Sequence, residues 1–313
     1  MSRSNADQSR KVLGVSAMKI HRSSALRVLG LAALLLGATT ALWGCGALVR
    51  RAAQPVMDNL VRSTMKQDDL ELVRLGTPGY LLMLDGLVEG NPDDAYTLLA
   101  AARLYSAYAG AFLGQEDGLR ARKMTRRARD YAFRAMSLKN EAFARLHDQP
   151  FEAFQAVPAS MGEGDEELLF IVVGTWAAYV EAHREDWDAL ADLPKIEALA
   201  RRLLELDEAY YYGTPHLVLG ALETLLPPSM GGKPEEAREH FERAVEISRG
   251  RFLQAHVLYA ERYARMVYDR PLHDRLLTHV LEAPADAVPE LTLLNTVAKE
   301  RARALLAGAD AYF

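Results

Sequence analysis

Four prolines in this chain each follow a polar or charged residue at a place where a helix can begin. Proline fits the first turn of a helix because the N–H that it lacks has no partner there, and a preceding Thr or Asn can cap that turn. Each pair therefore predicts a helix start, and four starts predict many short helices joined by tight turns. The pairs are Thr77-Pro78, Asn91-Pro92, Thr214-Pro215 and Lys233-Pro234.

The residues around these pairs favour helix over strand. Ala, Leu, Arg and Glu are abundant and β-branched residues are sparse, and we find no strand-length alternation of apolar and polar residues bounded by hairpin turns. The one β-leaning patch, Phe170–Val173, lies inside Glu166–Glu181, an apolar stretch long enough for a buried helix. We therefore predict an all-α fold. Its further helices are Asp58–Leu75, ending at Gly76, then Arg251–Tyr268, Pro271–Leu281 and Pro289–Ala307.

Small and aromatic residues recur with spacings of four and three. In tetratricopeptide repeats, the second helix of each pair carries small, aromatic and small residues at this spacing, which lets the two helices approach closely. A more degenerate pair lies between Trp176 and Leu203, and the overall spacing is irregular. The predicted architecture is a stack of tetratricopeptide-like helix pairs, an α-solenoid or superhelix whose concave face suits peptides or proteins. The recurring residues are Ala128, Ala132, Ala135, Ala237, Phe241 and Ala244.

The N-terminus has the pattern of a secretory signal that ends in a lipobox. Basic residues follow Met18, the apolar run Val28–Gly37 comes next, and Leu42-Trp43-Gly44-Cys45 closes the segment. Leu at −3, Gly at −1 and Cys at +1 resemble a bacterial lipobox, although Trp at −2 is less usual than a small residue. We expect a signal peptide over 1–44, with 1–17 a mis-annotated extension if translation starts at Met18. Acylated Cys45 then begins a linker over 45–57, and 58–313 form a single helical domain.

The alternative for this segment is a transmembrane anchor with a chance cysteine. Glycines and threonines interrupt the apolar run, which is shorter than the roughly 20 apolar residues of a membrane span. Lipidation also accounts for the lone cysteine, which can form neither an internal disulfide nor a CxxC site. Gly46 rather than Asp follows Cys45, and by the sorting rule of enteric bacteria this favours the outer membrane over the inner, facing the periplasm.

The chain carries no sequence motif of an enzyme. Its eight histidines are scattered without HExxH spacing, and G-x-S-x-G, Walker A and Rossmann patterns are absent. The segment Met230–Pro234 superficially resembles a phosphate loop, but Pro234 removes a backbone donor, and we interpret it as a turn before a helix. The net charge of −5 provides no basic field for nucleic acid. We therefore expect no catalysis, no metal, no cofactor and no nucleic-acid partner.

Two groups of polar residues are candidates for binding. One is a carboxylate inside the apolar stretch Tyr80–Val88, where it needs a partner, either a structural bond to an arginine or helix N-terminus or a contact with a ligand. The other is formed by tyrosines, on one predicted helix face and directly before a helix start. Tyrosine suits a binding groove because it joins apolar area to a hydroxyl, although core and inter-helix packing is the alternative. The candidates are Asp85, Tyr105, Tyr108, Tyr211 and Tyr212.

Five segments carry a pattern more specific than any repeat consensus: Gln67–Arg74, Gly76–Gly86, Leu104–Gly110, Gly231–Phe241 and Ala298–Phe313. They resemble the TRAP transporter T-component family. The resemblance implies a periplasmic lipoprotein with tetratricopeptide-like helix pairs, linked to a tripartite ATP-independent periplasmic (TRAP) transporter, which uses a solute-binding protein and a membrane permease. It implies docking of the solute-binding protein, assembly into a homo-oligomer such as a trimer, and a pore or cleft that passes a small solute.

Among the candidate residues, only Cys45 corresponds to a functional position of the family. Two other functions fit parts of the sequence. One is a general tetratricopeptide-type scaffold lipoprotein for envelope assembly, which shares the anchor and the helix pairs. The other is an enzyme, which has only the apolar-flanked carboxylate of Asp85 in its favour.

Overall fold

The computed structural model describes residues 59–313, so the signal segment, Cys45 and the linker lie outside the described residues. Residues Arg62–Phe313 form one compact unit. No strand occurs in the described part of the chain, and the predicted all-α fold is confirmed. The longer helices are α2 (Leu70–Gly90), α3 (Ala95–Phe112), α4 (Gly118–Lys139), α8 (Glu166–Ala182), α10 (Leu193–Leu206), α11 (Tyr210–Glu223), α12 (Pro234–Ser248), α14 (Arg270–Glu282) and α15 (Thr292–Ala307). The shorter ones are α5 (Glu141–Leu146), α6 (Phe151–Phe154), α7 (Ala156–Ala159), α9 (Trp187–Leu190), α13 (Leu253–Leu258) and α16 (Ala309–Tyr312).

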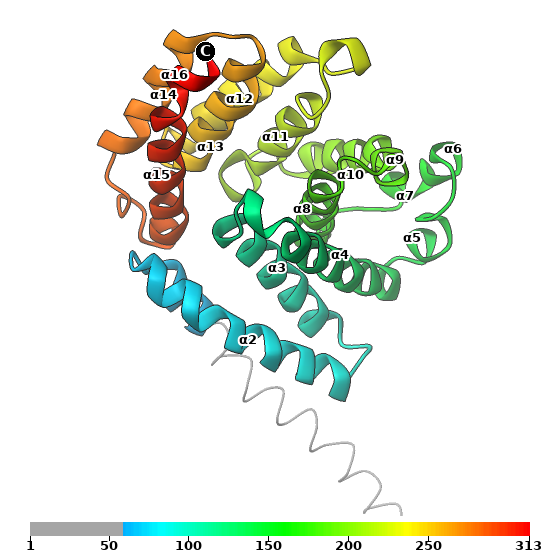
Figure 1. Ribbon diagram of the computed structural model, residues 1–313. Coiled ribbons are helices and arrows are strands. Elements are labelled where there is room, and N and C mark those ends of the chain that lie inside the picture. Colours follow the sequence, from blue (N-terminus) through cyan, green and yellow to red (C-terminus); the bar gives the residue numbers. More distant parts are fainter. Residues whose placement is uncertain (1–58) are drawn as a thin grey trace, which may run out of the picture. The chain divides into compact units, whose positions relative to one another are not determined.

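Helices that follow one another in the sequence mostly pack on one another (Figure 1). The most extensive contacts join α3 to α4 and α11 to α12, while α8 lies against α3, α4 and α10. The C-terminal part returns to the N-terminal part of the unit: α15 touches α2, and Nζ of Lys66, before α2, lies 3.8 Å from Oε1 of Glu290, before α15. Both of these side chains are more than half exposed, so their ion pair adds little to stability.

The small residues singled out in the sequence lie in the core. Ala128, Ala132 and Ala135 are fully buried in α4, and Phe241 lies between two fully buried alanines of α12. A Cβ added to Gly220 of α11 would lie 3.0 Å from the ring of Phe241. Glycine at this position therefore lets α11 approach α12 closely. The relation of these pairs to tetratricopeptide repeats stays a prediction.

Helix α2 runs directly through Thr77-Pro78, so the predicted helix end at Gly76 and the restart at this pair are wrong. The predicted helix Asp58–Leu75 is interrupted: residues 59–65 are helical, and α2 begins only after Asp69, whose carboxylate accepts a hydrogen bond from the N–H of Leu72 at 2.9 Å. Pro78 leaves the carbonyl of Arg74 without its helical partner. Packing outweighs this loss, because a stripe of α2 is buried against α3: Val73, Thr77, Leu81, Leu84 and Val88.

The other three proline pairs have different outcomes. Asn91 ends α2, and α3 starts only at Ala95, with Asp94 as its cap, so the start predicted at Asn91-Pro92 is wrong by a few residues. Lys233-Pro234 starts α12 as predicted, and residues 230–233 form the expected turn before it. Thr214-Pro215 lies within α11, directly after a turn with non-helical backbone angles.

That turn consists of three consecutive residues with left-handed backbone angles. Tyr211 has φ 40°, Tyr212 has φ 62° and Gly213 has φ 79°. Each non-glycine residue in this region costs about 1–2 kcal/mol. Aromatic packing offsets the strain, because the Tyr211 ring lies 5.6 Å from that of Phe170 in α8 and both tyrosine rings lie about 6 Å from that of Phe252.

The helices predicted in the C-terminal part are present. The segment from Leu253 continues α13 through a π-helical turn, Tyr259–Ala264, and ends near residue 266. Helix α14 starts at Arg270 with Asp269 as its cap, and α15 follows a short 3-10 turn, Pro289–Leu291.

Candidate functional site

Asp85 lies in the middle of a polar network that joins three helices. Its carboxylate accepts hydrogen bonds from the hydroxyls of Tyr105 in α3, at 2.7 Å, and of Tyr131 in α4, at 2.8 Å. The guanidinium of Arg127 in α4 lies 3.2 Å from the same carboxylate. The Asp85 side chain is 17% exposed, so the network is reached by water at its edge. These contacts tie α2 to both α3 and α4.

The electrostatics of the network keep both tyrosine hydroxyls protonated, so that they can donate to the carboxylate. Burial raises the pKa of Tyr105, and the Asp85 carboxylate adds to the increase. Burial also raises the pKa of Tyr131, whose hydroxyl accepts a hydrogen bond from Nε of Arg127 at 3.2 Å. This bond in turn raises the pKa of Arg127. Asp85 thus has the arginine partner that its structural interpretation requires, and its role in binding stays a prediction.

Sequence reasoning did not identify Arg127 or Tyr131 as partners of Asp85. The one local signal was their spacing of four on a helix, which places both side chains on one face. Nothing in the sequence joins this pair to a carboxylate 46 residues before Tyr131.

Tyr108 lies one turn after Tyr105 on α3 and has its own partners. It is 4% exposed, its ring packs 5.5 Å from that of Phe112, and Nη2 of Arg120 lies 3.5 Å from its hydroxyl. The Arg120 guanidinium also lies 5.6 Å from the centre of the Tyr108 ring. Tyr108 is thus next to the Asp85 network but bonded to a different arginine.

Tyr211 and Tyr212 belong to a second cluster, in the left-handed turn that opens α11. Burial raises the pKa of Tyr211, and the guanidinium of Arg103 in α3 lies 6.0 Å from its ring centre. Together with Phe170 and Phe252, these aromatic side chains bring α3, α8 and α13 together at the start of α11. The packing role that the sequence left open for the tyrosines is therefore present.

The side of α2 that points away from α3 is apolar between two exposed carboxylates near the ends of the helix. Its five large side chains are exposed by 40–72%, and a Cβ added to any of its four glycines would meet nothing within 4 Å. The residues recur every three or four positions and so form one face, opposite the buried stripe. Exposed apolar patches of this kind mark interaction sites. This outer face consists of Leu72, Leu75, Gly76, Gly79, Leu82, Met83, Gly86, Leu87 and Gly90.

Glycine lowers helix stability by about 1 kcal/mol relative to alanine, so four glycines on one exposed face do not serve the helix itself. Small residues at a helix surface let a second backbone approach closely, as they do where helices pack in membranes. Two exposed carboxylates, Glu71 and Glu89, border the outer face near the two ends of α2, while Arg74 lies away from it. The outer face thus fits an apolar protein surface better than water.

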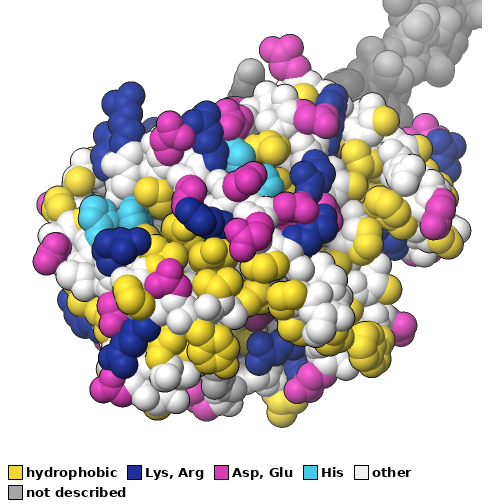
Figure 2. Space-filling model, turned by 90° about the horizontal axis from the view of Figure 1, so that it is seen from above, with side chains coloured by type: hydrophobic (Ala, Val, Ile, Leu, Met, Phe, Trp, Pro, Cys, Tyr) yellow, Lys and Arg dark blue, Asp and Glu magenta, His cyan; other side chains and the backbone are white. Residues whose placement is uncertain are grey.

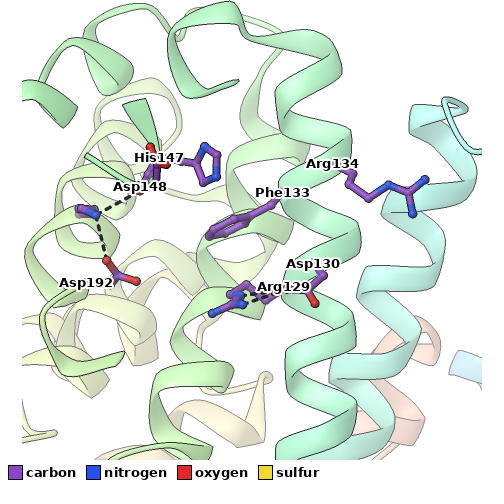
Figure 3. Close-up of a pocket in the computed structure, with 8 residues that line it drawn as sticks. Arg129, Asp130, Phe133, Arg134, His147, Asp148 and Asp192 are labelled. Atoms are coloured by element: carbon purple, nitrogen blue, oxygen red, sulfur yellow. Dashed lines mark hydrogen bonds and ion pairs between the residues drawn. The ribbon is translucent and has the colours of Figure 1, made fainter. Parts of the chain in front are cut away.

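A pocket of about 490 Å³ lies between α4, the end of α5 and α10. Figure 3 shows Phe133 and His147 directed toward each other across it, while Arg134 points away. The buried ammonium group of Lys195, which also lines the pocket, donates hydrogen bonds to the carbonyl of His147 at 3.1 Å and to the carboxylate of Asp192 at 3.0 Å. Arg129 is paired with Asp130, while Arg134 donates to the carbonyl of Pro92 and Asp148 accepts from Gln149. The charged groups of the pocket thus have partners in the protein and define no ligand class.

Two further observations concern metals and membranes. Within residues 59–313, no group of three or more His, Cys, Asp or Glu side chains is placed to hold a metal ion. In the same part of the chain, no helix has the length and apolar character needed to cross a membrane. Cys45, the predicted lipidation site, lies outside the described residues.

The fold and these sites define a helical protein built from sequentially packed helices, with one long helix that presents an apolar face. The chain belongs to the TRAP transporter T-component family, whose model matches residues 66–313. It is therefore an accessory component of a TRAP transporter. A protein of Treponema pallidum (strain Nichols), named only as an uncharacterized protein, is 28% identical over 284 residues, which span 82% of this chain and 84% of the relative. The family resemblance seen in the sequence is thus confirmed.

Proposed function

We propose that this protein is a lipid-anchored periplasmic component that docks the solute-binding protein of its TRAP transporter. The observation that carries the proposal is the exposed outer face of α2, which lies within the part of the chain that the family model matches. A helix face with five large exposed apolar side chains, charged only at its borders, favours a protein partner over water.

The size of the outer face suits a transient complex. Covering its five large side chains would remove on the order of 500 Å² of surface on this protein from water, compared with about 800 Å² per partner in a standard stable interface. Interfaces below the standard size are typical of encounters that must dissociate. A component that meets a solute-binding protein and then releases it needs an interface of this kind.

The Asp85 network supports docking by fixing the position of the helix. Its bonds to Tyr105, Tyr131 and Arg127 tie α2 to α3 and α4. In this proposal Asp85 and Tyr105 hold the outer face in place, while Tyr108, Tyr211 and Tyr212 are the candidate contacts of a small solute that passes through a cleft. Acyl chains on Cys45 would hold the domain at the outer membrane, since each buried methylene contributes about 0.8 kcal/mol.

The test is recovery of the solute-binding protein from detergent-solubilised membranes with the tagged full-length chain. The double variant Leu75→Glu/Leu82→Glu places two charges on the outer face, and we expect recovery to fall at least tenfold. Leu119→Glu is the matched control, because Leu119 is 80% exposed on a different helix and should leave recovery unchanged. Circular dichroism verifies that all variants fold.

Two outcomes would contradict the proposal. In one, the wild-type chain never recovers a solute-binding protein. In the other, the double variant recovers as much as the wild type. If deletion of the gene damages the outer membrane while solute uptake stays normal, the general scaffold function is the better description. The anchor is tested separately with Cys45→Ala, which should release the protein from the membrane fraction and abolish labelling with radioactive palmitate.

A further inference from the structure

Four titratable side chains form a continuous series between the end of α10, α11 and α12. Two are carboxylates at the ends and two are imidazoles between them. On the face shown in Figure 2, histidine side chains reach the surface in two places, each among acidic and basic side chains. In order, the members of this acid–imidazole chain are Glu208, His216, His240 and Glu223.

The distances along the acid–imidazole chain are short. Oε1 of Glu208 lies 3.2 Å from Nε2 of His216, and Nδ1 of His216 lies 2.8 Å from Nδ1 of His240. The last link is longer, with 3.7 Å between Nε2 of His240 and Oε1 of Glu223. His216 is 7% exposed and Glu223 is 5% exposed, so the inner links are shielded from water.

The two carboxyl groups at the ends of the acid–imidazole chain determine which ring nitrogens carry protons. Hydrogen bonds from Arg243 and His216 lower the pKa of Glu208 to about 2, so this carboxylate is ionised and can only accept. His216 must then donate from Nε2, which leaves its Nδ1 as an acceptor. His240 therefore donates from Nδ1 and presents the lone pair of its Nε2 to Glu223.

Glu223 is a buried carboxyl group with incomplete partners. Its Oε2 atom is buried and has no hydrogen-bond partner. From α10, Glu223 faces Glu197 and Arg201, whose Nη2 lies 3.4 Å from Oε1 of Glu223. From α12 and the residue before it, Glu223 faces Glu236, His240 and Lys233. Arg201 is shared, because it also lies 2.7 Å from Glu197 and 3.9 Å from Glu236.

We propose that the acid–imidazole chain is a proton-binding site, in which one exchangeable proton on the buried carboxyl end controls how firmly α11 is bonded to α12. The acid–imidazole chain has three links: Glu208–His216, His216–His240 and His240–Glu223. With one proton on each imidazole and one on Glu223, every link holds one proton. His240 then donates to His216 and His216 to Glu208, while the Glu223 hydroxyl faces Nε2 of His240 across 3.7 Å, a separation that must shorten for a hydrogen bond to form. This is the only proton count at which each link has one donor and one acceptor.

Loss or gain of a proton breaks one link. When Glu223 releases its proton to the base in solution, two protons are left for three links, and one carboxylate faces a lone pair. When acid adds a fourth proton, two N–H groups face each other across 2.8 Å, and the imidazoles must separate. Burial raises the pKa of Glu223 to about 7, and burial lowers that of His240 to about 4. The fully bonded state therefore lies between these values.

The Glu208–His216 link spans the left-handed turn Tyr211–Gly213. Arg243 of α12 binds the same Glu208 carboxylate at 2.8 and 3.1 Å. The link between Glu208 and His216 thus bridges the strained turn, and Arg243 holds the same carboxylate to α12.

The test is ring nitrogen NMR on the full-length protein with ¹⁵N-labelled histidine. At pH 6 we expect His216 as the Nε2–H tautomer and His240 as the Nδ1–H tautomer, with neither ring charged at pH 5.5. Between pH 6 and 8 the His240 signals should shift as Glu223 loses its proton, with a midpoint near 7. In the isosteric variant Glu223→Gln this shift should disappear.

Glu242→Gln is the matched control. Glu242 is also on α12, but it is bonded to Arg238 and Tyr259 rather than to the acid–imidazole chain, so its loss should leave the His240 shift in place. Potentiometric titration gives a second measurement, in which wild type releases about one more proton than Glu223→Gln between pH 6 and 8. Either of two results would overturn the proposal: rings that charge near the ordinary histidine pKa, or a His240 shift that survives in Glu223→Gln.

Discussion

Replacing Asp85 by asparagine or alanine separates the charge of this residue from its role as a hydrogen-bond acceptor. A hydrogen bond to a charged group contributes about 1.5–3 kcal/mol and a neutral one about 1 kcal/mol, so neutralising the two tyrosine bonds removes about 1–4 kcal/mol in total. The Arg127 pair adds less than about 1 kcal/mol, because the Arg127 side chain is 51% exposed. We therefore expect Asp85→Asn to lower the free energy of unfolding by about 2 kcal/mol.

Asp85→Ala should be more harmful than Asp85→Asn. It leaves the hydroxyls of Tyr105 and Tyr131 without an acceptor in a mostly buried site, and each unsatisfied group costs about 1–3 kcal/mol. The expected loss is about 4 kcal/mol, measured from urea unfolding followed by circular dichroism. Tyr105→Phe in the same background should show a coupling energy of about 1 kcal/mol with Asp85→Asn.

If the free energy of unfolding of Asp85→Ala stayed within about 0.5 kcal/mol of that of wild type, the usual range of surface substitutions, the network would not stabilise the packing of α2 on α3 and α4. Strict additivity of Asp85→Asn and Tyr105→Phe would lead to the same conclusion. If Asp85→Asn folds normally but no longer recovers the solute-binding protein, the residue acts in binding rather than in stability.

Four substitutions test the packing and electrostatics of single residues. Gly213→Ala should destabilise the protein by about 1–3 kcal/mol in thermal unfolding, because φ is 79° and the new Cβ would lie 3.3 Å from Cα of Ala244. Gly79→Ala, on the open face of α2, should instead stabilise it by about 0.5–1 kcal/mol. Phe241→Ala should cost about 3–5 kcal/mol, since Phe241 is fully buried; a smaller loss would mean that the α11–α12 core is loosely packed. Because the pKa of Tyr105 is higher in the folded protein than in the unfolded chain, the unfolded chain loses this proton first as the pH rises above 10. Wild-type stability should therefore fall above pH 10, and it should fall less in Tyr105→Phe.

The fold class followed from sequence because helix propensity and the absence of strand patterns act locally. Local signals also placed the start of α12 at Lys233-Pro234, where nothing else competes. They failed at Thr77-Pro78, because the stripe from Val73 to Val88 packs on α3 and holds the helix together through the proline. Whether a helix continues through a proline depends on what its far side touches, which is information that a local pattern does not contain.

In the candidate site, too, local sequence signals identified some residues, and those that depend on tertiary contacts were missed. Asp85 and Tyr105 were both singled out in the sequence, and the structure bonds them directly. Their partners on α4, Arg127 and Tyr131, were missed because tertiary packing brings them to Asp85. The left-handed turn at Tyr211 was also missed, since of its three residues only Gly213 carries a sequence signal for positive φ.

Because α2 packs mainly on α3 and touches α15 only locally, it has fewer tertiary partners than the helices around α8. Its amide hydrogens should therefore exchange with solvent through a local opening that needs less free energy than global unfolding. A protein that covers the outer face would suppress that opening and slow exchange along the whole helix. Deuterium uptake by residues 70–90 thus becomes a direct reporter of docking, and the affinity of any partner includes the free energy of keeping α2 closed.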